Sequence, residues 1–426
     1  MNSNALALLG GGPVGEVQPD PHPSFSPEAI RRVTELLQQG QTVALGRGNP
    51  ILAEAEAAIA CWQGAPYCLT TSTGTAALHS AVMGLELTAG DEVITTPYTW
   101  GASISCLLYN NAVPIFADVD PETGLLDPAS VEERITPRTR GILAVHIYGQ
   151  AANMTALCAI ATKCGLVVIE DGSQAHGALH RGRKVGQFGD AAGFSCMGGK
   201  LLASSEGGYM VTPHEQVYWK AALCGQHYGR SSDPGFPEML RPYVDSLATS
   251  YRLSPLTAVL LSEQLKKVDE ESEGRRRNAA LFRQELAGVQ SVRFPSYAEG
   301  DVPSYHMLTM NFQPEYAGLR RDTYLRALQA ETVGIFAYIP SSITTWRRLQ
   351  WQSYDGPRVM WTETLRRAGV DYAAMEVPNC ELKVARSLEM GWNYVRVDDA
   401  RTRRLASAFH KVEENLDALR AWERKA

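Results

Sequence analysis

The stretch Gly193-Phe-Ser-Cys-Met-Gly-Gly-Lys200-Leu-Leu-Ala-Ser-Ser-Glu-Gly-Gly208 places a single lysine on a glycine pair between two apolar runs. Residues 191–197 and 209–212 have the pattern of strands, and the glycines between them let the backbone turn back tightly. Lys200 is therefore expected in an inner loop. A partly desolvated lysine has a lowered proton affinity and becomes an amine nucleophile, which Schiff-base chemistry requires. Most lysines are solvated, so the function of Lys200 depends on the residues around it.

The length and composition are those of an ordinary globular chain. Its 426 residues are enough for two domains, at about 100–200 residues each. A formal net charge of −6 argues against a general attraction to nucleic acid or anionic membranes, so a phosphate would have to be held at a local site. No apolar run approaches membrane-spanning length, and residues 1–9 lack the charged start of a signal peptide. The eight cysteines include no CxxC pair and the nine histidines show no metal-ligand spacing, so we expect a cytoplasmic protein without a metal site.

Apolar strand patterns alternate with helical patterns through the first half of the chain. This alternation predicts a mostly parallel sheet that helices cover on both faces. The expected strands are 92–95, 113–117 and 141–145, and one further strand is expected before each of the turns at 72–75 and 171–174. The expected helices are 27–39, 51–62, 102–109 and 128–135.

The second half of the chain has a different character. A long helix is expected to open at residues 250–255 and to run to about Arg277, and its charged second half indicates a helix that leaves one domain for another. The remainder predicts a smaller α+β domain, with strands near 306–312 and 393–397 and helices at 320–329 and 400–422. The expected division is an N-terminal arm over 1–24, a large domain over 25–262 and a small C-terminal domain over 263–426.

The hydroxyl-rich turn Ser72-Thr73-Gly74-Thr75 lies between a short strand and an amphipathic helix. A helix N-terminus presents unpaired N–H groups and a partial positive charge, and Thr73, Gly74 and Thr75 add hydroxyls and close backbone approach. An anion is therefore expected there. The alternative is an ordinary helix N-cap, which serine and threonine supply without any ligand, and the local sequence favours neither.

The run Ile169-Glu170-Asp171-Gly-Ser-Gln174 ends a buried strand in two carboxylates. Buried acids are rare unless a cationic group pairs with them, and Gln174 is close enough to Asp171 to face the same pocket. A protonated pyridine nitrogen is one such cation, and an aspartate at this position holds pyridoxal as an electron sink. A helix N-cap is the other interpretation of Asp171. Trp100 follows the strand at 92–95 and is either core packing or a ring on which a flat cofactor stacks.

These motifs together resemble the DegT/StrS family of pyridoxal-phosphate aminotransferases, which act on keto-sugars and keto-cyclitols. The resemblance runs from about Leu6 to Asn415, and the order and spacing of the motifs match throughout. It implies the type I fold of pyridoxal-phosphate enzymes, an α/β class with a mostly parallel seven-stranded sheet and a smaller C-terminal α+β domain. The most specific motifs for this resemblance are 72–79, 97–100, 118–120, 145–150, 170–177, 185–190, 194–200 and 206–208.

The resemblance implies pyridoxal 5′-phosphate as the cofactor and a role for each site residue. Lys200 is expected to form the Schiff base and later to carry the proton, and Asp171 to pair with the pyridinium nitrogen. Gln174 is expected to hydrogen-bond the phenolic oxygen and Trp100 to stack on the ring. The phosphate is expected at Thr73, Gly74, Thr75 and Ser195.

The resemblance also implies a homodimer with shared active sites, in which the partner subunit contributes a side chain to the cofactor phosphate. The family motif reads Asn-Tyr-Arg, whereas this chain has Ser250-Tyr251-Arg252, so a serine hydroxyl would replace the amide. A second departure is Cys196-Met-Gly-Gly199, where relatives often carry bulkier residues. This departure implies an altered pocket near Lys200.

The implied reaction is a ping-pong transamination from glutamine or glutamate to a keto acceptor. The opening Leu-Leu-Gly-Gly-Gly-Pro and the ending 408–415 resemble the cyclitol-aminating branch of the family. This resemblance implies a keto-cyclitol of the scyllo-inosose type as the acceptor, in an aminoglycoside-like pathway. A nucleotide-linked keto-sugar is the near alternative. Dehydration or aromatisation on the same fold is another, although relatives that dehydrate commonly replace the lysine by histidine. The remaining alternative is a non-catalytic regulatory protein that keeps the fold, and intact Lys200, Asp171 and Gln174 argue against it.

Overall fold

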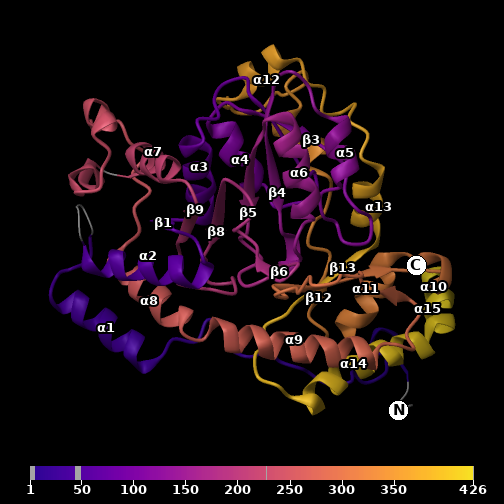
Figure 1. The fold of residues 1–426 in the computed structure, drawn as a ribbon. Helices are drawn as coiled ribbons and strands as arrows, with labels where there is room; N and C mark the ends of the chain where they lie inside the picture. The colour runs from indigo at the N-terminus through magenta and orange to yellow at the C-terminus, as the bar shows by residue number, and fades with distance from the viewer. Residues whose placement is uncertain (1–4, 44–48, 227, 426) are drawn as a thin grey trace.

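A seven-stranded sheet forms the centre of the larger part of the molecule (Figure 1). The structure, a computed structural model, describes residues 5–43, 49–226 and 228–425. The strand order is β1-β9-β8-β5-β4-β2-β3, and the neighbouring strands are parallel except for the two pairs that β9 makes. The predicted mostly parallel sheet is therefore confirmed. Its strands are β1 (Tyr67–Thr71), β2 (Glu92–Thr95), β3 (Val113–Phe116), β4 (Thr139–Val145), β5 (Val167–Asp171), β8 (Ala191–Ser195) and β9 (Gly208–Thr212).

Helices cover both faces of this sheet because successive strand residues point to opposite sides. Leu143 and Ile169 pack on one face with α3 and α4, whereas Ile142 and Val168 pack on the other with α6. Near β1 and β9 this second face is covered by α2 and α8. The helices of this part are α1 (Pro27–Gln38), α2 (Pro50–Gln63), α3 (Gly74–Gly84), α4 (Ala102–Tyr109), α5 (Pro128–Glu133), α6 (Met154–Cys164), α7 (Glu215–Gly225) and α8 (Pro255–Leu265).

The second sheet belongs to the predicted α+β domain and is antiparallel throughout, in the order β10-β11-β13-β12. Phe282, Phe312 and Phe409 lie in the core between this sheet and its helices. Among the described residues, no helix combines the length and the apolar character needed to cross a membrane. The elements are β10 (Val292–Arg293), β11 (Met307–Phe312), β12 (Ile335–Phe336), β13 (Ser387–Gly391), α9 (Val268–Glu285), α10 (Pro314–Ala317), α11 (Arg321–Ala330), α14 (Asp399–Glu414) and α15 (Leu416–Glu423).

The segment between β12 and β13 returns to the large sheet. Ile343, Trp361 and Tyr372 pack into the same core as strands β2 and β3, and the Tyr372 hydroxyl donates to the carbonyl of Pro114 at 2.9 Å. The sequence assigned this segment to the domain at 263–426, and the division between the domains stays a prediction. The segment contains α12 (Thr362–Ala368) and α13 (Pro378–Arg386).

Short elements complete the fold. A two-stranded ribbon, β6 (Leu179–His180) and β7 (Arg183–Lys184), lies between β5 and β8 in the sequence. The 3₁₀ helices are at Ala7–Leu9, Ile147–Gly149, Tyr228–Ser232, Glu238–Tyr243, Ile343–Thr345 and Arg347–Leu349.

Three sequence predictions in the second half were wrong in detail. The long helix is two helices, because α8 ends at Leu265 and α9 begins at Val268. The C-terminal helix is also divided, at Asn415. Residues 393–397 are not a strand, since the carbonyls of Tyr394 and Arg396 accept hydrogen bonds from the side-chain amide of Asn278 on α9.

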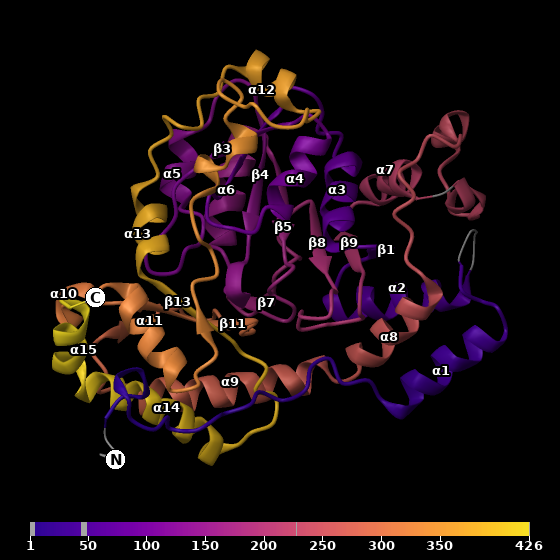
Figure 2. The ribbon, with the colours of Figure 1, turned by 180° about the vertical axis from the view of Figure 1, so that it is seen from behind.

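The N-terminal arm lies along the small domain and α9 before it enters α1, as the indigo trace in Figure 2 shows. The predicted arm covers 1–24, of which 1–4 lie outside the described residues. The buried Glu331 accepts from the backbone N–H groups of Ala7 and Val14 at 2.8 and 2.9 Å. Lys411 donates to the same carboxylate at 2.9 Å, so the arm is tied to the core of the small domain.

Candidate active site

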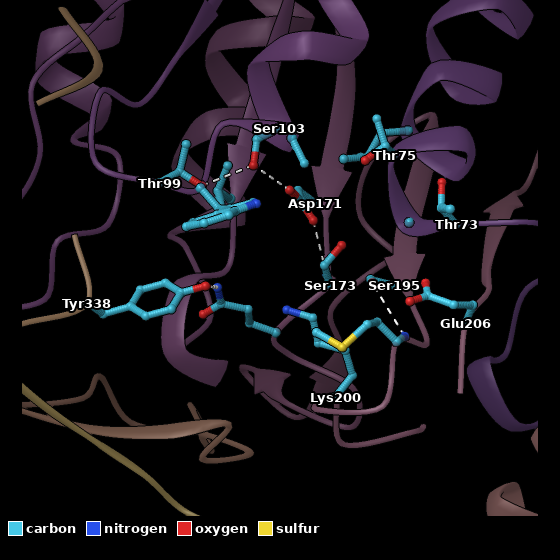
Figure 3. A pocket seen from close by; sticks show the side chains of 17 residues that line it. Thr73, Thr75, Thr99, Ser103, Asp171, Ser173, Ser195, Lys200, Glu206 and Tyr338 are labelled. Atoms are coloured by element: carbon cyan, nitrogen blue, oxygen red, sulfur yellow. Dashed lines mark hydrogen bonds between the residues drawn. The ribbon is translucent and has the colours of Figure 1, made fainter. Parts of the chain in front are cut away.

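A cavity of about 470 Å³ opens where the parallel strands end at their carboxyl termini (Figure 3). This is the edge at which open α/β sheets bind ligands. The amine of Lys200 points to the centre of the cavity, with Asp171 above it and Tyr338 to one side. The lining residues are Thr73, Gly74, Thr75, Leu78, Thr99, Trp100, Ala102, Ser103, Val145, Asp171, Ser173, Gln174, Ser195, Met197, Lys200, Glu206 and Tyr338.

Asp171 is the last residue of β5 and is held on both carboxylate oxygens. The hydroxyl of Ser103 on α4 donates to Oδ2 at 2.6 Å, and the backbone N–H of Ser173 donates to Oδ1 at 3.0 Å. The side chain is buried, yet among the described residues it forms no ion pair. A buried carboxylate that faces a cavity in this way is suited to a cationic ligand atom.

Glu170, the second carboxylate of the strand, points away from the cavity into the opposite face of the sheet. It accepts from the N–H groups of Gly186, Phe188 and Gly189 at 2.7, 2.8 and 2.7 Å and lies 3.0 Å from Nε2 of His146. Burial acts to raise the pKa of Glu170, but these hydrogen bonds hold its pKa below the ordinary value. Glu170 is therefore a structural ion, and of these two strand carboxylates only Asp171 lines the cavity.

Lys200 lies in the loop between β8 and β9, as the sequence predicted. This loop is closed at its base by the pairing of Ser195 with Gly208. Burial lowers the pKa of the Lys200 amine, and the nearby Asp171 carboxylate partly opposes that shift. The amine is thus more easily deprotonated than an exposed lysine, and a deprotonated amine is the nucleophilic form.

The N-terminus of α3 borders the cavity on its far side and has the features of an anion-binding site. The side chain of Thr73 caps the helix by accepting from Ala76 N at 3.0 Å, so the N-cap interpretation is correct. The first N–H groups of a helix nevertheless have no intrahelical acceptor, and Gly74 and Thr75 line the cavity at this point. A Cβ on Gly74 would lie 2.4 Å from Cβ of Ser195, so only glycine permits this close approach. The backbone N–H groups and the Ser195 hydroxyl together fit a phosphate.

The opposite wall is aromatic. Trp100 lies 6.1 Å from Tyr338, ring centroid to centroid, at an interplanar angle of 31°. Oε1 of Gln174 accepts from Tyr148 N at 2.7 Å, which leaves the amide NH₂ to donate into the cavity, 3.5 Å from the Tyr338 hydroxyl. A flat ring with a cationic nitrogen, an oxygen and a phosphate fits these donors and acceptors, which is the pattern of pyridoxal phosphate.

Ser250 and His176 do not line the cavity. Ser250 is exposed in its own chain, with a positive φ of 56°. His176 is buried against Phe194 and Tyr209, at ring distances of 5.3 and 6.0 Å, and neither of its nitrogens has a hydrogen-bond partner among the described residues. Burial lowers the pKa of His176 to about 3, so it is a neutral core residue.

Ser103, Ser173 and Tyr338 were missed by sequence reasoning. The Ser103 hydroxyl is 3.0 Å from that of Thr99, but Thr99 precedes α4, so no helical spacing in the sequence links the two residues. Ser173 contributes its backbone N–H, which any residue except proline carries, so the residue type at this position does not indicate the role. Tyr338 comes from the segment that returns to the large sheet after β12, and no local pattern links it to the cavity.

A lysine facing a fixed aspartate, beside a helix N-terminus at the carboxyl edge of an open sheet, defines a pyridoxal-phosphate enzyme of fold type I. Residues 23–368 match the DegT/DnrJ/EryC1/StrS aminotransferase family. The chain belongs to this family and is a pyridoxal-phosphate-dependent aminotransferase.

Individual relatives agree with this assignment. The chain is 34% identical over 427 residues to the L-glutamine:2-deoxy-scyllo-inosose aminotransferase of Streptomyces paromomycinus, which covers 96% of this chain and 98% of that protein. It is 39% identical over 291 residues to a protein of the same name from Micromonospora echinospora, covering 67% and 69%. Among solved structures, the aminotransferase from Psychrobacter cryohalolentis superposes with a TM-score of 0.79 at 26% identity, covering 94% of this chain and 100% of that one.

Proposed function

We propose that this enzyme transfers an amino group from L-glutamine or glutamate to a keto-cyclitol of the scyllo-inosose type, in aminoglycoside-like secondary metabolism. The observation that carries the proposal is the end-to-end similarity to an L-glutamine:2-deoxy-scyllo-inosose aminotransferase, at 34% identity over 96% of this chain. A match over 96% of the chain extends beyond the family match at 23–368, into the arm and the C-terminal part of the small domain.

Pyridoxal 5′-phosphate is the cofactor that the cavity would hold. Lys200 would bind it covalently and Asp171 would pair with its ring nitrogen, while Trp100 would stack on the ring and Gln174 would donate to its phenolic oxygen. When bound, the cofactor withdraws electrons from the bonds at the amino carbon of the donor. The phosphate would be held by Thr73, Gly74, Thr75 and Ser195.

The residues of the chain then move protons and position groups. The lowered pKa of Lys200 favours its neutral amine, which can accept a proton in one step of the reaction and return it in a later step. Ser103 and the Ser173 N–H keep the Asp171 carboxylate facing inward, because each oxygen has a fixed donor. Burial and the nearby Asp171 raise the pKa of Tyr338, so its hydroxyl keeps its proton and can donate to an acceptor oxygen.

Half-reaction spectroscopy tests the proposal directly. The purified enzyme is loaded with cofactor, treated with glutamine or glutamate, and then offered scyllo-inosose-type ketones or nucleotide-linked keto-sugars. We expect the donor to discharge the cofactor band and the keto-cyclitol to restore it with the highest kcat/KM. If only a nucleotide-linked keto-sugar restored the cofactor band, the acceptor would be a keto-sugar nucleotide and not a keto-cyclitol.

The same experiment also tests the two remaining alternatives, a different pyridoxal-phosphate reaction and a non-catalytic protein. Products with a lost hydroxyl or an aromatic ring would indicate dehydration or aromatisation. A chain that forms no imine reducible by borohydride would be a regulatory protein that keeps the fold. The intact set of Lys200, Asp171 and Gln174 around one cavity supports transamination over both.

We also infer a homodimer in which Ser250 reaches the cofactor phosphate of the partner subunit. The exposure of Ser250 in its own chain supports this arrangement. Subunits with Lys200→Ala are mixed with subunits with Ser250→Asp, which places a negative charge beside the phosphate. If Ser250 acts across the dimer, the mixed dimer contains one intact site and activity returns on mixing. If it acts within one chain, every site in the mixture keeps a defect and activity stays absent.

The cysteines bear on the cellular setting. All eight are free thiols. Free thiols support a reducing compartment, and we infer a cytoplasmic location.

A further inference from the structure

The imidazole of His22, in the N-terminal arm, contacts the backbone of Lys200. Nε2 of His22 lies 2.7 Å from the carbonyl oxygen of Lys200, across 178 positions of sequence. A carbonyl oxygen only accepts, so Nε2 carries the proton in this hydrogen bond. The His22 side chain is only 3% exposed, which shields the bond from competing water.

The backbone of Lys200 has few other restraints. Its N–H donates to the carbonyl of Met197 at 2.8 Å, which is a contact within the same loop. Gly198 and Gly199 precede it, and glycine leaves the backbone more conformational freedom than any other residue. Among the described residues, His22 is the one side chain that hydrogen-bonds to the Lys200 backbone from outside the loop.

His22 is itself held firmly on both sides. Two residues before it, the Asp20 carboxylate accepts from Arg401 at 3.0 Å and from Arg396 N at 2.9 Å. Two residues after it, the Ser24 carbonyl accepts from Gln264 at 3.1 Å. Nδ1 of His22 faces the Glu271 carboxylate at 3.8 Å, beyond hydrogen-bond distance. The arm therefore presents the imidazole to Lys200 from a fixed position.

We propose that His22 is a positioning residue for transamination, which fixes the Lys200 carbonyl so that the amine returns to one place opposite Asp171. The inference rests on the proposed role of Lys200. A lysine side chain has four rotatable bonds, so a small rotation of its Cα moves the amine by a large distance. Misplacement of a reacting group by about 1 Å can reduce a rate on the order of 100-fold. Burial lowers the pKa of His22, which keeps the ring neutral and its Nε2–H available to the carbonyl.

Substitutions of His22 distinguish the effect of its hydrogen bond to Lys200 from the effect of its ring packing. His22→Phe keeps a ring but removes the donor, whereas His22→Gln places an amide N–H near the same position. His410 offers a matched control because its Nε2 contacts the carbonyl of Glu285 at 2.9 Å, in the small domain. We expect His22→Phe to lower kcat about 10- to 100-fold with little change in KM for the donor. We expect His22→Gln to restore most of the rate and His410→Phe to leave it unchanged.

A second measurement uses the apoprotein and does not depend on turnover. Reductive methylation of Lys200 is followed by peptide mass spectrometry across a pH series. His22→Phe should move the midpoint of labelling upward, toward the ordinary lysine pKa, because a loosened Lys200 reaches water. His22→Gln and His410→Phe should keep the wild-type midpoint.

The outcomes distinguish this inference from the proposed function. A wild-type midpoint and rate in His22→Phe, or a loss that His22→Gln does not repair, would overturn the positioning role. Borohydride reduction of the wild-type holoenzyme separately shows which lysine holds the cofactor. Attachment of the cofactor at another lysine would overturn the proposed role of Lys200, and the hydrogen bond from His22 would then have no catalytic role. The midpoint of Lys200 methylation in the apoprotein would still show whether His22 restrains Lys200.

Discussion

The hydroxyl of Ser103 on α4 donates a 2.6 Å hydrogen bond to Oδ2 of Asp171 at the end of β5. The Ser103 hydroxyl is in turn 3.0 Å from that of Thr99, so a chain of hydroxyls leads from the loop after β2 to the carboxylate. This chain fixes the rotation of the carboxylate plane. The orientation of the group that would pair with the cofactor nitrogen is thus set by a helix that carries no charged residue.

Removal of this donor should weaken cofactor binding. For Ser103→Ala we expect the dissociation constant of pyridoxal phosphate to rise about 10-fold, since a hydrogen bond to a charged group contributes about 1.5–3 kcal/mol. Fluorescence titration of the apoprotein measures this constant. Ser105→Ala on the same helix is the control, because Ser105 donates only to the carbonyl of Ala102. Equal affinities in both variants would contradict the assigned role of Ser103.

The close approach of α3 to β8 should not tolerate a side chain at Gly74. A Cβ there would lie 2.4 Å from Cβ of Ser195, so we expect Gly74→Ala to lower the free energy of unfolding by about 1–3 kcal/mol and to displace the phosphate. Urea denaturation and cofactor titration measure the two effects. Gly288→Ala, where the new Cβ meets no atom within 4 Å, is the matched control. The new Cβ would also lie 2.7 Å from the backbone Cα of Ser195, so trimming the Ser195 side chain would not relieve the clash. Equal stabilities of Gly74→Ala and Gly288→Ala would contradict this prediction.

The buried His176 should make stability fall in mild acid. Its pKa is about 3 in the folded protein against an ordinary 6.5, so between these values only the unfolded chain binds the proton. From pH 7 to pH 5 this group alone removes about 2 kcal/mol from the free energy of unfolding. Burial also lowers the pKa of His306, which acts in the same direction. Urea denaturation of wild type and His176→Phe at both pH values isolates His176, and parallel profiles would contradict its neutral burial.

The hydroxyl of Tyr338 should contribute to acceptor recognition. Tyr338→Phe keeps the ring beside Trp100 but removes the donor near Gln174. We expect kcat/KM for the keto acceptor to fall about 10-fold, while the donor half-reaction and cofactor affinity stay close to wild type. Steady-state kinetics with each substrate varied in turn measures this split. Tyr243→Phe, at an exposed position on the 3₁₀ helix Glu238–Tyr243, is the control.

Much of the large sheet was predictable because its strands are buried on both faces and therefore read as continuous apolar runs. The runs at 92–95 and 141–145 lie within strands, and the helix predicted at 102–109 has the bounds of α4. The lysine loop and the cluster of Lys200, Asp171 and Gln174 were also predictable. Each belongs to a local motif at the end of a strand, and the carboxyl ends of parallel strands meet at one edge of the sheet.

The remaining features depend on contacts that a local pattern does not contain. Residues 393–397 are rich in valine and tyrosine, which are common in strands. The edge of β11 is already paired with 387–391, however, and Asn278 donates to two carbonyls of the predicted strand. The break at Lys266 and Lys267 lies inside a continuous helical pattern, where α8 leaves the large domain. His22 and Tyr338 come from segments far before and far after the lysine loop in the sequence, so neither could be placed before the tertiary fold was known.

The antiparallel strand β9 turns the lysine loop into the tip of a hairpin. Its two ends are fixed at Ser195 and Gly208, whereas a crossover between parallel strands would need a helix on one face of the sheet. The twelve residues between them, 196–207, can therefore be exchanged with those of a relative as one cassette, with the register of the sheet unchanged. Residues beside the reactive amine, such as Met197 and Glu206, can therefore change during evolution while the pairing of β8 with β9 stays the same.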